Sequence, residues 1–308
     1  MIIVSIKGGL GNQLQQYALY RKFISMGVDA KVDLSWFDDL NQVNMAAKRR
    51  VELDYFPGVN YQSCTRKERK RLVGGDGVLG KIRRKLFGLC GAPLVKIYSE
   101  STMYDEKLLT LKDCYLDGYF ANEFYYADII NELKKELTFP VNESKNKDKI
   151  LEYANQMNAE ESVSIHLRRG DYLDKINQAM FGGICTDEYY ESAVKYILEN
   201  VDKPRLYIFS DDTEYALKFS MSLQSRGYVA EVIDINHGDE SFYDIFLMSK
   251  CKHHITANST FSFWGARLSD ETGIKIRPSK QKNSQEFCDE MRTWWDGWTF
   301  ISPSGEVL

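Results

Sequence analysis

A histidine and two arginines stand at the end of a strand-like run and are followed at once by a glycine and an aspartate. The segment is Ser164–Tyr172 (SIHLRRGDY), with His166, Arg168 and Arg169. Successive side chains of a strand point to opposite faces, so one arginine can reach a ligand while the other braces the fold. Guanidinium suits bidentate capture of phosphate, and ligands of open α/β sheets lie beyond the carboxyl ends of strands. The segment therefore predicts a phosphate-binding site.

A second segment that can hold a polar ligand lies near the N-terminus. Gly8–Gln13 (GGLGNQ) follows a strand-like run and opens a helical pattern, so backbone N–H groups can face a ligand at the helix end. It is not a P-loop, because no Gly-Lys-Ser/Thr follows. As a dinucleotide fingerprint it is partial: Leu14 replaces the third glycine, although Asp33 stands about where a ribose-binding acid would. A nicotinamide-dependent enzyme remains an alternative, as does a plain strand–helix turn capped by Asn12.

Two more motifs follow strand-like runs in the second half of the chain. Asn258–Gly265 (NSTFSFWG) opens a helix, and the hydroxyls of Ser259 and Thr260 are suited to cap it or to bind phosphate at its positive end. Phe209–Asp212 (FSDD) precedes another helix, which Asp212 can cap. An acidic pair that holds a metal is the other interpretation of this motif.

In their order along the chain, these motifs resemble those of the bacterial α-1,2-fucosyltransferases of glycosyltransferase family 11. The matching segments are residues 8–17 (GGLGNQLQQY), 166–172 (HLRRGDY), 209–212 (FSDD) and 253–266 (HHITANSTFSFWGA). The sequence departs from the family pattern at Gln15, where an aromatic residue is usual, and we expect this change to alter packing or the acceptor side. The resemblance implies an α/β fold of two Rossmann-like domains facing a cleft, the GT-B architecture.

The resemblance also implies a site for a GDP-fucose donor. Arg168 would hold the β-phosphate and His166 would touch the nucleoside. Asp211 would accept hydrogen bonds from guanine N1–H and N2–H₂, and Arg169 would pair with a carboxylate such as Asp171. The remaining candidates for the donor site are Asn258, Ser259, Thr260 and Phe261, although the aromatic residues of this motif are also expected in the core.

On the acceptor side, the resemblance places Gly11, Asn12 and Gln13 beside the reacting sugar, with Asn12 and Arg168 as the catalytic candidates. The implied reaction is an inverting transfer of L-fucose from GDP-β-L-fucose to the 2-hydroxyl of a terminal galactose on an O-antigen or related surface glycan. Arginine would stabilise the charge on the departing phosphate, so no metal or other cofactor is expected. The general base is left unassigned among carboxylates that include Asp171, Asp187 and Glu188.

Three other functions stay open. A glycosyltransferase with another donor or linkage would use the same motifs. A non-catalytic GDP-sugar-binding protein would bind GDP without turnover. An NAD-dependent oxidoreductase would use the partial glycine fingerprint, but it leaves the arginine motif unexplained.

Composition limits the class of protein. The chain has 308 residues, enough for two domains, with a net charge of −4 that gives no global attraction to nucleic acid. No apolar run approaches the length of a membrane span. Six cysteines without C-x-x-C spacing, and His253 and His254 without ligand spacing, argue against a zinc site and fit free thiols in the cytoplasm. Residues 66–85 are strongly basic, which predicts a solvated surface or peripheral contact with the anionic inner face of a membrane or with a lipid-linked acceptor.

The order of apolar patterns predicts the domains. Strand-like and helix-like runs alternate, which is typical of parallel doubly wound sheets. We expect an acceptor-side α/β domain at 1–145, a GDP-sugar-binding Rossmann-like domain at 150–285, and a segment at 286–308 that packs across both. A helix is expected at 121–137, a linker at 141–149, and irregular insertions at 40–113. The strands expected in the second half are 162–167, 205–209, 230–235, 254–257 and 274–277, with helices at 187–200, 213–226, 240–249 and 259–269.

Overall fold

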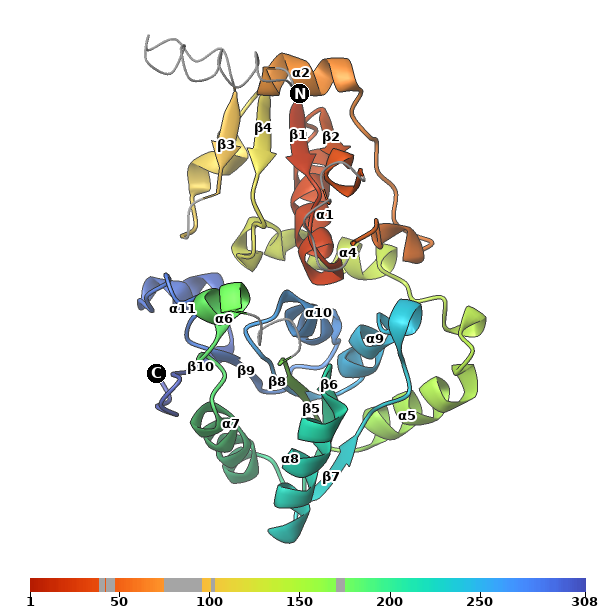
Figure 1. The fold of residues 1–308 in the computed structure, drawn as a ribbon, viewed down its shortest axis with the longest axis vertical. Helices are drawn as coiled ribbons and strands as arrows, with labels where there is room; N and C mark the ends of the chain where they lie inside the picture. The colour runs from red at the N-terminus through yellow and green to blue at the C-terminus, as the bar shows by residue number, and fades with distance from the viewer. Residues whose placement is uncertain (39–41, 43–47, 75–95, 101–102, 170–174) are drawn as a thin grey trace. The chain divides into compact units, whose positions relative to one another are not determined.

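The chain forms two compact units, Met1–Thr138 and Phe139–Leu308 (Figure 1). The computed structural model describes residues 1–38, 42, 48–74, 96–100, 103–169 and 175–308. Each unit contains one sheet, and the named strands of both sheets pair in parallel. The predicted α/β class, with two domains built on parallel sheets, is confirmed.

The first unit holds a four-stranded sheet in the order β2-β1-β4-β3. Its strands are β1 (Ile2–Ser5), β2 (Ala30–Asp33), β3 (Ile97–Ser99) and β4 (Cys114–Asp117). Its helices are α1 (Leu10–Ser25), α2 (Arg66–Val73), α4 (Ile130–Glu136) and the 3-10 turns η1 (Ser35–Phe37), η3 (Leu53–Tyr55), η4 (Glu106–Thr110), η5 (Glu123–Tyr125) and η6 (Ala127–Ile129). Strand β1 is buried along its whole length, which agrees with its apolar run of Ile2, Ile3 and Val4.

The second unit holds a six-stranded sheet in the order β10-β9-β8-β5-β6-β7. Its strands are β5 (Ser162–Leu167), β6 (Arg205–Ser210), β7 (Val229–Val232), β8 (His253–Ile255), β9 (Lys275–Pro278) and β10 (Trp298–Ile301). Its helices are α5 (Lys147–Ala159), α6 (Lys175–Phe181), α7 (Asp187–Asn200), α8 (Thr213–Ser225), α9 (Tyr243–Ser249), α10 (Thr260–Leu268), α11 (Glu290–Trp294) and the 3-10 turns η7 (Val141–Glu143) and η9 (Gly238–Glu240).

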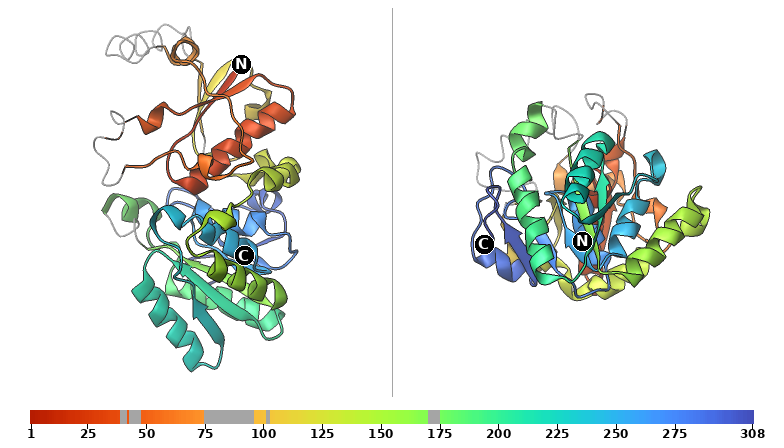
Figure 2. Two further views of the ribbon diagram at one scale, coloured as in Figure 1. Left: turned by 90° about the vertical axis from the view of Figure 1, so that its right-hand side faces the viewer. Right: turned by 90° about the horizontal axis from the view of Figure 1, so that it is seen from below.

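Strand β5 is the centre of the second unit, and all six of its residues are buried. Its odd-numbered side chains, Val163, Ile165 and Leu167, belong to an apolar cluster with residues of α7 and α8. The even-numbered side chains face the other side of the sheet, where the His166 ring meets that of Phe261 in α10. In the end-on view of Figure 2, α7 and α8 lie across this sheet from α5 and α9.

Both sheets reverse their strand order at one point. In the second sheet the chain proceeds from β5 through β6 to β7 on one side and from β8 through β9 to β10 on the other. In the first sheet the reversal lies between β1 and β4. Ligands of open α/β sheets bind at the carboxyl ends of the strands at such points. The segments after β1, β5 and β8 are those that the sequence singles out as ligand-binding.

The predicted strands of the second half are confirmed to within a few residues at their ends, but two other expectations need correction. Residues 121–137 form two 3-10 turns and the short α4 rather than one helix. Residues 141–149 are not a linker, because η7 and the start of α5 occupy them, Val141 is buried, and Asn146 Nδ2 donates to the Ile235 carbonyl at 2.5 Å. A lysine-rich composition marks a solvated surface, which a helix provides as readily as a linker.

The domain limits also differ from those expected. The division falls between Thr138 and Phe139, and residues 286–308 lie wholly within the second unit. There β10 forms the edge of the sheet, pairing in parallel with β9, and Phe300 and Ile301 are fully buried. Trp295 packs against Phe263 with ring centroids 5.7 Å apart. The C-terminal segment is therefore part of the core of this unit.

Substitution of Gly265 tests the packing that holds α10 in place. A Cβ atom at this position would lie 2.7 Å from Met248 Cβ on α9. Overpacking costs about 1–3 kcal/mol, whereas alanine gains about 1 kcal/mol of helix propensity over glycine. Gly265→Ala is therefore expected to lower the free energy of unfolding by about 1 kcal/mol, measured by urea denaturation. Ser222→Ala, on the exposed surface of α8, is the control, and a Gly265→Ala protein as stable as this control would contradict the packing account.

Candidate functional site

The carboxyl ends of β5 and β6 are joined by an ion pair between Arg168 and Asp211. Arg168 Nη1 lies 2.6 Å from Asp211 Oδ2, and the Arg169 backbone N–H donates to Asp211 Oδ1 at 2.9 Å. The Ser210 hydroxyl also donates to the Leu167 carbonyl at 2.8 Å. Asp211 thus holds both the side chain of one arginine and the backbone of the next. A guanidinium has five N–H donors, so one such group can bind more than one anion.

Arg169 has the bracing role that strand geometry predicts for one of the two arginines. Its guanidinium lies 4.1 Å from the centre of the Tyr215 ring, and its Nε is 3.4 Å from Asp212 Oδ2. Asp212 also caps α8 as predicted, since its Oδ1 accepts from the Tyr215 N–H at 3.0 Å. The observed carboxylate partner is Asp212, while the expected partner, Asp171, lies outside the described residues.

His166 is a buried, neutral group at the same edge of the sheet. Its ring centroid is 5.8 Å from that of Phe261, and its Nδ1 has no hydrogen-bond partner in the described part of the chain. Burial, aided by the charge of Arg168, lowers the pKa of His166 to about 4. At neutral pH this imidazole can therefore exchange one hydrogen bond with a ligand without carrying charge.

The start of α10 lies next to these groups, because β8 pairs with β5. Ser259 is the N-cap residue and is buried, but its hydroxyl makes no capping hydrogen bond, contrary to the simplest expectation for a serine at this position. Thr260 is the first helical residue. Backbone N–H groups and the helix dipole favour an anion at such an end. Arg168, His166, Ser259, Thr260 and Phe261 are thus brought together.

Asn258 has a structural role that the sequence did not indicate. Its Nδ2 donates to the carbonyls of Phe181 and Gln281, both at 3.1 Å. The Cys185 thiol lies 3.3 Å from Asn258 Oδ1, and the Asn258 N–H donates to the Cys185 sulfur at 3.2 Å. A buried amide with these partners fixes the loop that leads into α10. Its position at the start of α10 is thereby fixed by the protein itself.

In the first unit, the segment after β1 forms a tight turn into α1. Gly8 has φ +83°, and a Cβ atom there would lie 2.8 Å from Asn12 Nδ2, so the position requires glycine. Gly9 is the N-cap residue, so Asn12 lies in the first turn and is not the cap considered for it. Gly11 is buried, while the Asn12 side chain is partly exposed.

Gln13 acts as a brace, although the sequence suggested a ligand contact. Its Nε2 donates to the carbonyls of Gly8 and Arg50 at 3.0 and 2.9 Å, and its Oε1 accepts from the Glu52 N–H at 2.8 Å. It is fully buried, so its amide is used in fastening the segment around residues 50–52 to the turn. Of the three acceptor-side candidates, Asn12 is the one whose side chain reaches the surface.

Asp33 cannot hold a ribose as the nicotinamide alternative requires. Its Oδ2 accepts from Arg69 Nε and from the Tyr115 hydroxyl, both at 2.7 Å, and its Oδ1 accepts from the Ser35 N–H at 3.0 Å. The residue is only 5% exposed. Because protein donors already saturate the Asp33 carboxylate, it is not available to bind a ribose. The dinucleotide interpretation of the glycine motif therefore lacks its ribose-binding acid.

A half-buried carboxylate that the sequence did not indicate, Asp244, lies beyond β7. Asp244, in the first turn of α9, accepts a hydrogen bond from Asn236 Nδ2 at 2.8 Å, and burial raises the pKa of Asp244 to about 7. Asn236 is buried, and its Oδ1 has no partner among the described residues. Asp234, which accepts from the Thr213 hydroxyl at 3.2 Å, connects this pair to the end of β6. A short sequence motif contains only residues that are close in the chain. Asp234, Asn236 and Asp244 form no such motif, so the sequence did not indicate them.

His253 and His254 are strand residues, as predicted. His253 Nδ1 accepts from the Ile274 N–H at 3.0 Å, and His254 Nδ1 is 2.8 Å from the Ser164 hydroxyl. Burial lowers the pKa of His254 to about 3. Within the described residues no cluster of three or more histidine, cysteine or acidic groups could hold a metal, and the five described cysteines are free thiols.

The described part of the basic segment is α2, and ion pairs hold two of its arginines. Arg69 Nε lies 2.7 Å from Asp33 Oδ2, and Arg71 Nη2 lies 2.5 Å from Asp113 Oδ1. Residues 75–85 lie outside the described residues. Among the helices that the structure describes, none has the length and apolar character needed to cross a bilayer.

Comparison with known proteins indicates the family of the chain. A model of the family described as glycosyl transferase family 11 matches residues 96–302. An Escherichia coli alpha-1,2-colitosyltransferase is 28% identical over 310 residues, 94% of this chain and 97% of the relative. The Escherichia coli O-antigen biosynthesis glycosyltransferase WbnK is 31% identical over 291 residues, 89% and 93% of the two chains. The solved structure of POFUT1 in complex with GDP is similar over 88% of this chain and 95% of that chain, with 13% identity and a TM-score of 0.43.

The parallel sheets place an arginine and a helix N-terminus at a strand switch point, an arrangement suited to an anionic ligand. The family model covers about two thirds of the chain, so this chain belongs to glycosyltransferase family 11.

Neutralising Asp211 tests whether it positions Arg168. In Asp211→Asn the arginine loses its charged partner and its fixed orientation, so GDP should bind about tenfold more weakly in calorimetry, because ordering the side chain again costs free energy. Asp202→Asn, an exposed acid after α7, is the control for the change of net charge. Unchanged GDP binding by Asp211→Asn, alongside loss of binding by Arg168→Ala, would show that Arg168 needs no such support.

Stability in acid tests the burial of His254. The folded pKa, about 3, is below the unfolded value near 6.5, so stabilisation by the neutral ring is complete above pH 6.5 and is lost as the pH falls towards 3. At pH 4 the loss is roughly 3 kcal/mol for a group shifted this far. His254→Gln should be less stable than wild type at pH 7 but decline less between pH 6.5 and 4, measured by urea unfolding. The exposed His237→Gln is the control, and parallel decline of wild type and His254→Gln would contradict the assignment.

Proposed function

We propose that this glycosyltransferase moves L-fucose from GDP-β-L-fucose to the 2-hydroxyl of a terminal galactose, with inversion and without a metal ion, on an O-antigen or related surface glycan. One observation carries the proposal. Arg168, fixed by Asp211, lies at the switch point of the second sheet, beside the strand that leads into the N-terminus of α10. The Arg168 guanidinium and the positively polarised N-terminus of α10 thereby lie at the same edge of the sheet.

This arrangement matches the charge that develops during transfer. As the bond between fucose and GDP breaks, negative charge accumulates on the β-phosphate, and preorganised donors that stabilise such charge commonly lower a barrier by several kcal/mol. Arg168 would hold the β-phosphate, with the Ser259 hydroxyl and the N-terminus of α10 as further donors. These groups supply the charge compensation for which other transferases use a divalent ion.

The nucleoside would bind against His166 and Phe261. The neutral His166 ring lies at van der Waals range of Phe261 and has an unpartnered Nδ1, so it can contact the ribose or base without a charge to desolvate. Phe261 is half-buried, so its ring can pack against His166 and still border the ligand.

Guanine recognition fits Asp244 better than Asp211. Both oxygens of Asp211 already accept from Arg168 and Arg169, whereas Asp244 is paired with a single described donor, Asn236. A carboxylate accepts from guanine N1–H and N2–H₂ together, and the unpartnered Asn236 Oδ1 adds an acceptor beside it. These contacts would favour guanine over adenine or uracil. Asp211 then acts as the positioning residue of Arg168.

On the acceptor side, Asn12 would contact the reacting sugar, while Gly11 allows the turn to approach it closely and Gln13 holds the turn in shape. A general base is not assigned. Asp187 Oδ1 accepts from the Tyr215 hydroxyl at 2.7 Å, which gives it a structural partner. Proton transfer late in the reaction to the departing phosphate would need no strong protein base.

A second donor is favoured by one comparison. The relative named as an alpha-1,2-colitosyltransferase is 28% identical over nearly the whole chain. Colitose is fucose without its 3-hydroxyl, so a family 11 site can be matched to either sugar by a change in one hydrogen-bonding position. GDP-colitose is therefore the runner-up donor. Peripheral contact of residues 66–85 with a membrane would rest on the lysines of α2 and on residues beyond it, since Arg69 and Arg71 are engaged in ion pairs.

Donor turnover in the presence of EDTA tests the proposal. GDP release from GDP-fucose should rise with a β-galactoside, survive EDTA, and fall by at least about 100-fold in Arg168→Ala, because a transition-state charge contact is removed. NMR of the product would show the α-1,2 linkage. GDP-colitose, GDP-mannose and UDP-galactose serve as donor controls.

Each other outcome rejects a particular part. Turnover with GDP-colitose alone would replace fucose as the donor, and loss of activity in EDTA that Mg²⁺ restores would reject metal independence. Binding of GDP-fucose with no turnover on any galactoside would favour a binding protein.

A further inference from the structure

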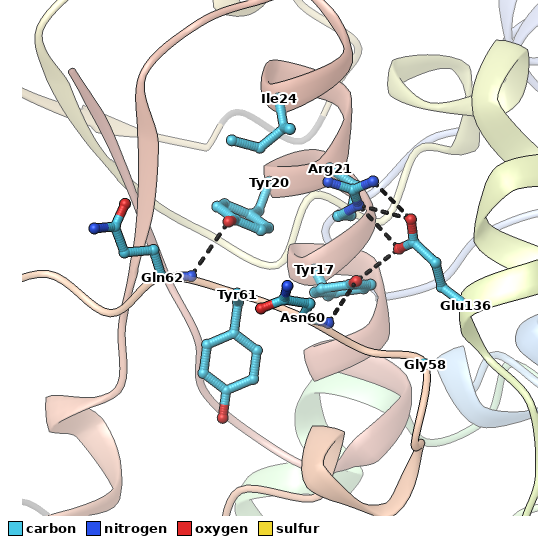
Figure 3. A pocket seen from close by; sticks show the side chains of 9 residues that line it. All are labelled: Tyr17, Tyr20, Arg21, Ile24, Gly58, Asn60, Tyr61, Gln62 and Glu136. Atoms are coloured by element: carbon cyan, nitrogen blue, oxygen red, sulfur yellow. Dashed lines mark hydrogen bonds and ion pairs between the residues drawn. The ribbon is translucent and has the colours of Figure 1, made fainter.

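A polar hollow of roughly 630 Å³ lies within the first unit, separate from the Gly8–Gln13 turn (Figure 3). One wall is the C-terminal half of α1, a second is the chain segment from Gly58 to Gln62, and the third is Glu136 at the end of α4. Its lining residues are Tyr17, Tyr20, Arg21, Ile24, Gly58, Asn60, Tyr61, Gln62 and Glu136. None of them is used by the reaction proposed above.

The hollow is built rigidly from backbone and tyrosine hydroxyl groups. The Asn60 N–H donates to the Tyr17 hydroxyl at 3.3 Å, and the Gln62 N–H donates to the Tyr20 hydroxyl at 3.2 Å. Gly58 is needed where the walls meet, because a Cβ atom there would lie 2.5 Å from the Glu136 carbonyl oxygen. The shape therefore exists before any ligand arrives, which lowers the cost of binding one.

The charges that face the hollow cancel. Arg21 Nε and Nη2 make a two-pronged pair with Glu136 at 2.6–3.0 Å, and the Tyr17 hydroxyl donates to Glu136 Oε2 at 2.6 Å. Arg21 and Glu136 are only 28% and 20% exposed, so each is largely compensated by the other. A phosphate or other anion would have to compete with Glu136 for Arg21. A neutral, hydrogen-bonding ligand fits this lining better.

The exposed rim carries the groups that recognise sugars. The side chains of Asn60 and Gln62 are exposed amides, each with both donor and acceptor capacity towards hydroxyl groups. Tyr61 stands between them, half-buried, with its hydroxyl held by Asp54 Oδ1 at 2.6 Å. A fixed aromatic ring offers a flat apolar surface to the C–H face of a sugar ring.

The hollow lies on the same helix as the acceptor-side turn. Gln13, Tyr17 and Arg21 are spaced by four residues and so follow one stripe of α1, along which the segment from Arg50 to Gln62 is fastened. At a rise of about 1.5 Å per residue, Tyr17 is roughly 7.5 Å along the helix from Asn12, and Ile24 roughly 18 Å. The hollow therefore lies further from Asn12 than one sugar unit reaches, at a distance that several linked units of an oligosaccharide can span.

We propose that this hollow is a second carbohydrate subsite, which binds neutral sugar units of the acceptor glycan that lie beyond the galactose receiving the transferred sugar. The inference rests on the proposed transferase function for the identity of the glycan, but the hollow itself is defined within one unit. It would select long acceptors over short ones without contributing to the chemical step.

The test compares a tetrasaccharide that ends in galactose, lacto-N-tetraose, with methyl β-D-galactoside. In the Asn60→Ala/Gln62→Ala double variant, both backbone hydrogen bonds that shape the segment remain. The KM for the tetrasaccharide should rise about tenfold, the effect of losing one or two ordinary hydrogen bonds, while kcat and the KM for the monosaccharide stay at wild-type values. Asn155→Ala/Asn158→Ala, two exposed amides of α5, is the matched control.

Saturation-transfer NMR of the full chain with lacto-N-tetraose and no donor gives a readout independent of turnover. Wild type should show contacts to the sugars next to the terminal galactose, and these should vanish both in the double variant and in Asn60→Trp, which fills the hollow. Equal tetrasaccharide KM values and equal NMR contacts in wild type and variants would overturn the subsite. Absence of turnover by wild type on every galactoside would instead reject the proposed function, and the NMR contacts would still decide the subsite.

Discussion

The site depends on one electrostatic contact, the ion pair between Arg168 at the end of β5 and Asp211 at the end of β6. A guanidinium near a phosphate is useful only if it is held in place, since a free arginine loses much of its gain to side-chain entropy. The carboxylate supplies that restraint, and it binds the backbone of Arg169 as well. Sheet pairing sets the distance, because Leu167 and Ser210 are directly opposite in the register of the two strands.

The two units use different means at equivalent positions. In the second unit, charged side chains converge at the switch point, which suits a diphosphate. In the first unit, amides dominate the turn after β1. Gln16 accepts from the Lys7 N–H at 2.8 Å and donates to the Gly118 carbonyl at 2.9 Å, joining the ends of β1 and β4. Gln13 fastens the segment around residue 50, and in the hollow the charges of Arg21 and Glu136 compensate each other. This division is consistent with a charged donor on one unit and a neutral glycan on the other.

The departures from expectation share a physical origin. Asn258, Gln13 and Asp33 have side chains of the type that binds ligands, but burial obliges such groups to be satisfied by the protein itself, and each is saturated by backbone or side-chain partners. Gln15 shows the opposite case: its amide is buried with no hydrogen-bond partner among the described residues, at the position where the family has an aromatic ring. Sequence spacing cannot reveal which polar groups form hydrogen bonds within the protein and which remain available to a ligand.

The sequence by itself determined the α/β class and, in the second unit, the strands β5 to β9 and the helices α7 to α10, because apolar periodicity and local motifs depend on near neighbours in the chain. It did not indicate β10, α5, α6 or α11. Only the tertiary structure decided that Asp211 is the partner of Arg168, that Asp212 is the partner of Arg169, and that the pair of Asn236 with Asp244 and the hollow beside α1 exist. These features join residues that are 8 to 119 positions apart, such as Asn236 with Asp244 and Tyr17 with Glu136. Such pairs are created by strand order and helix packing, and no local pattern in the chain encodes them.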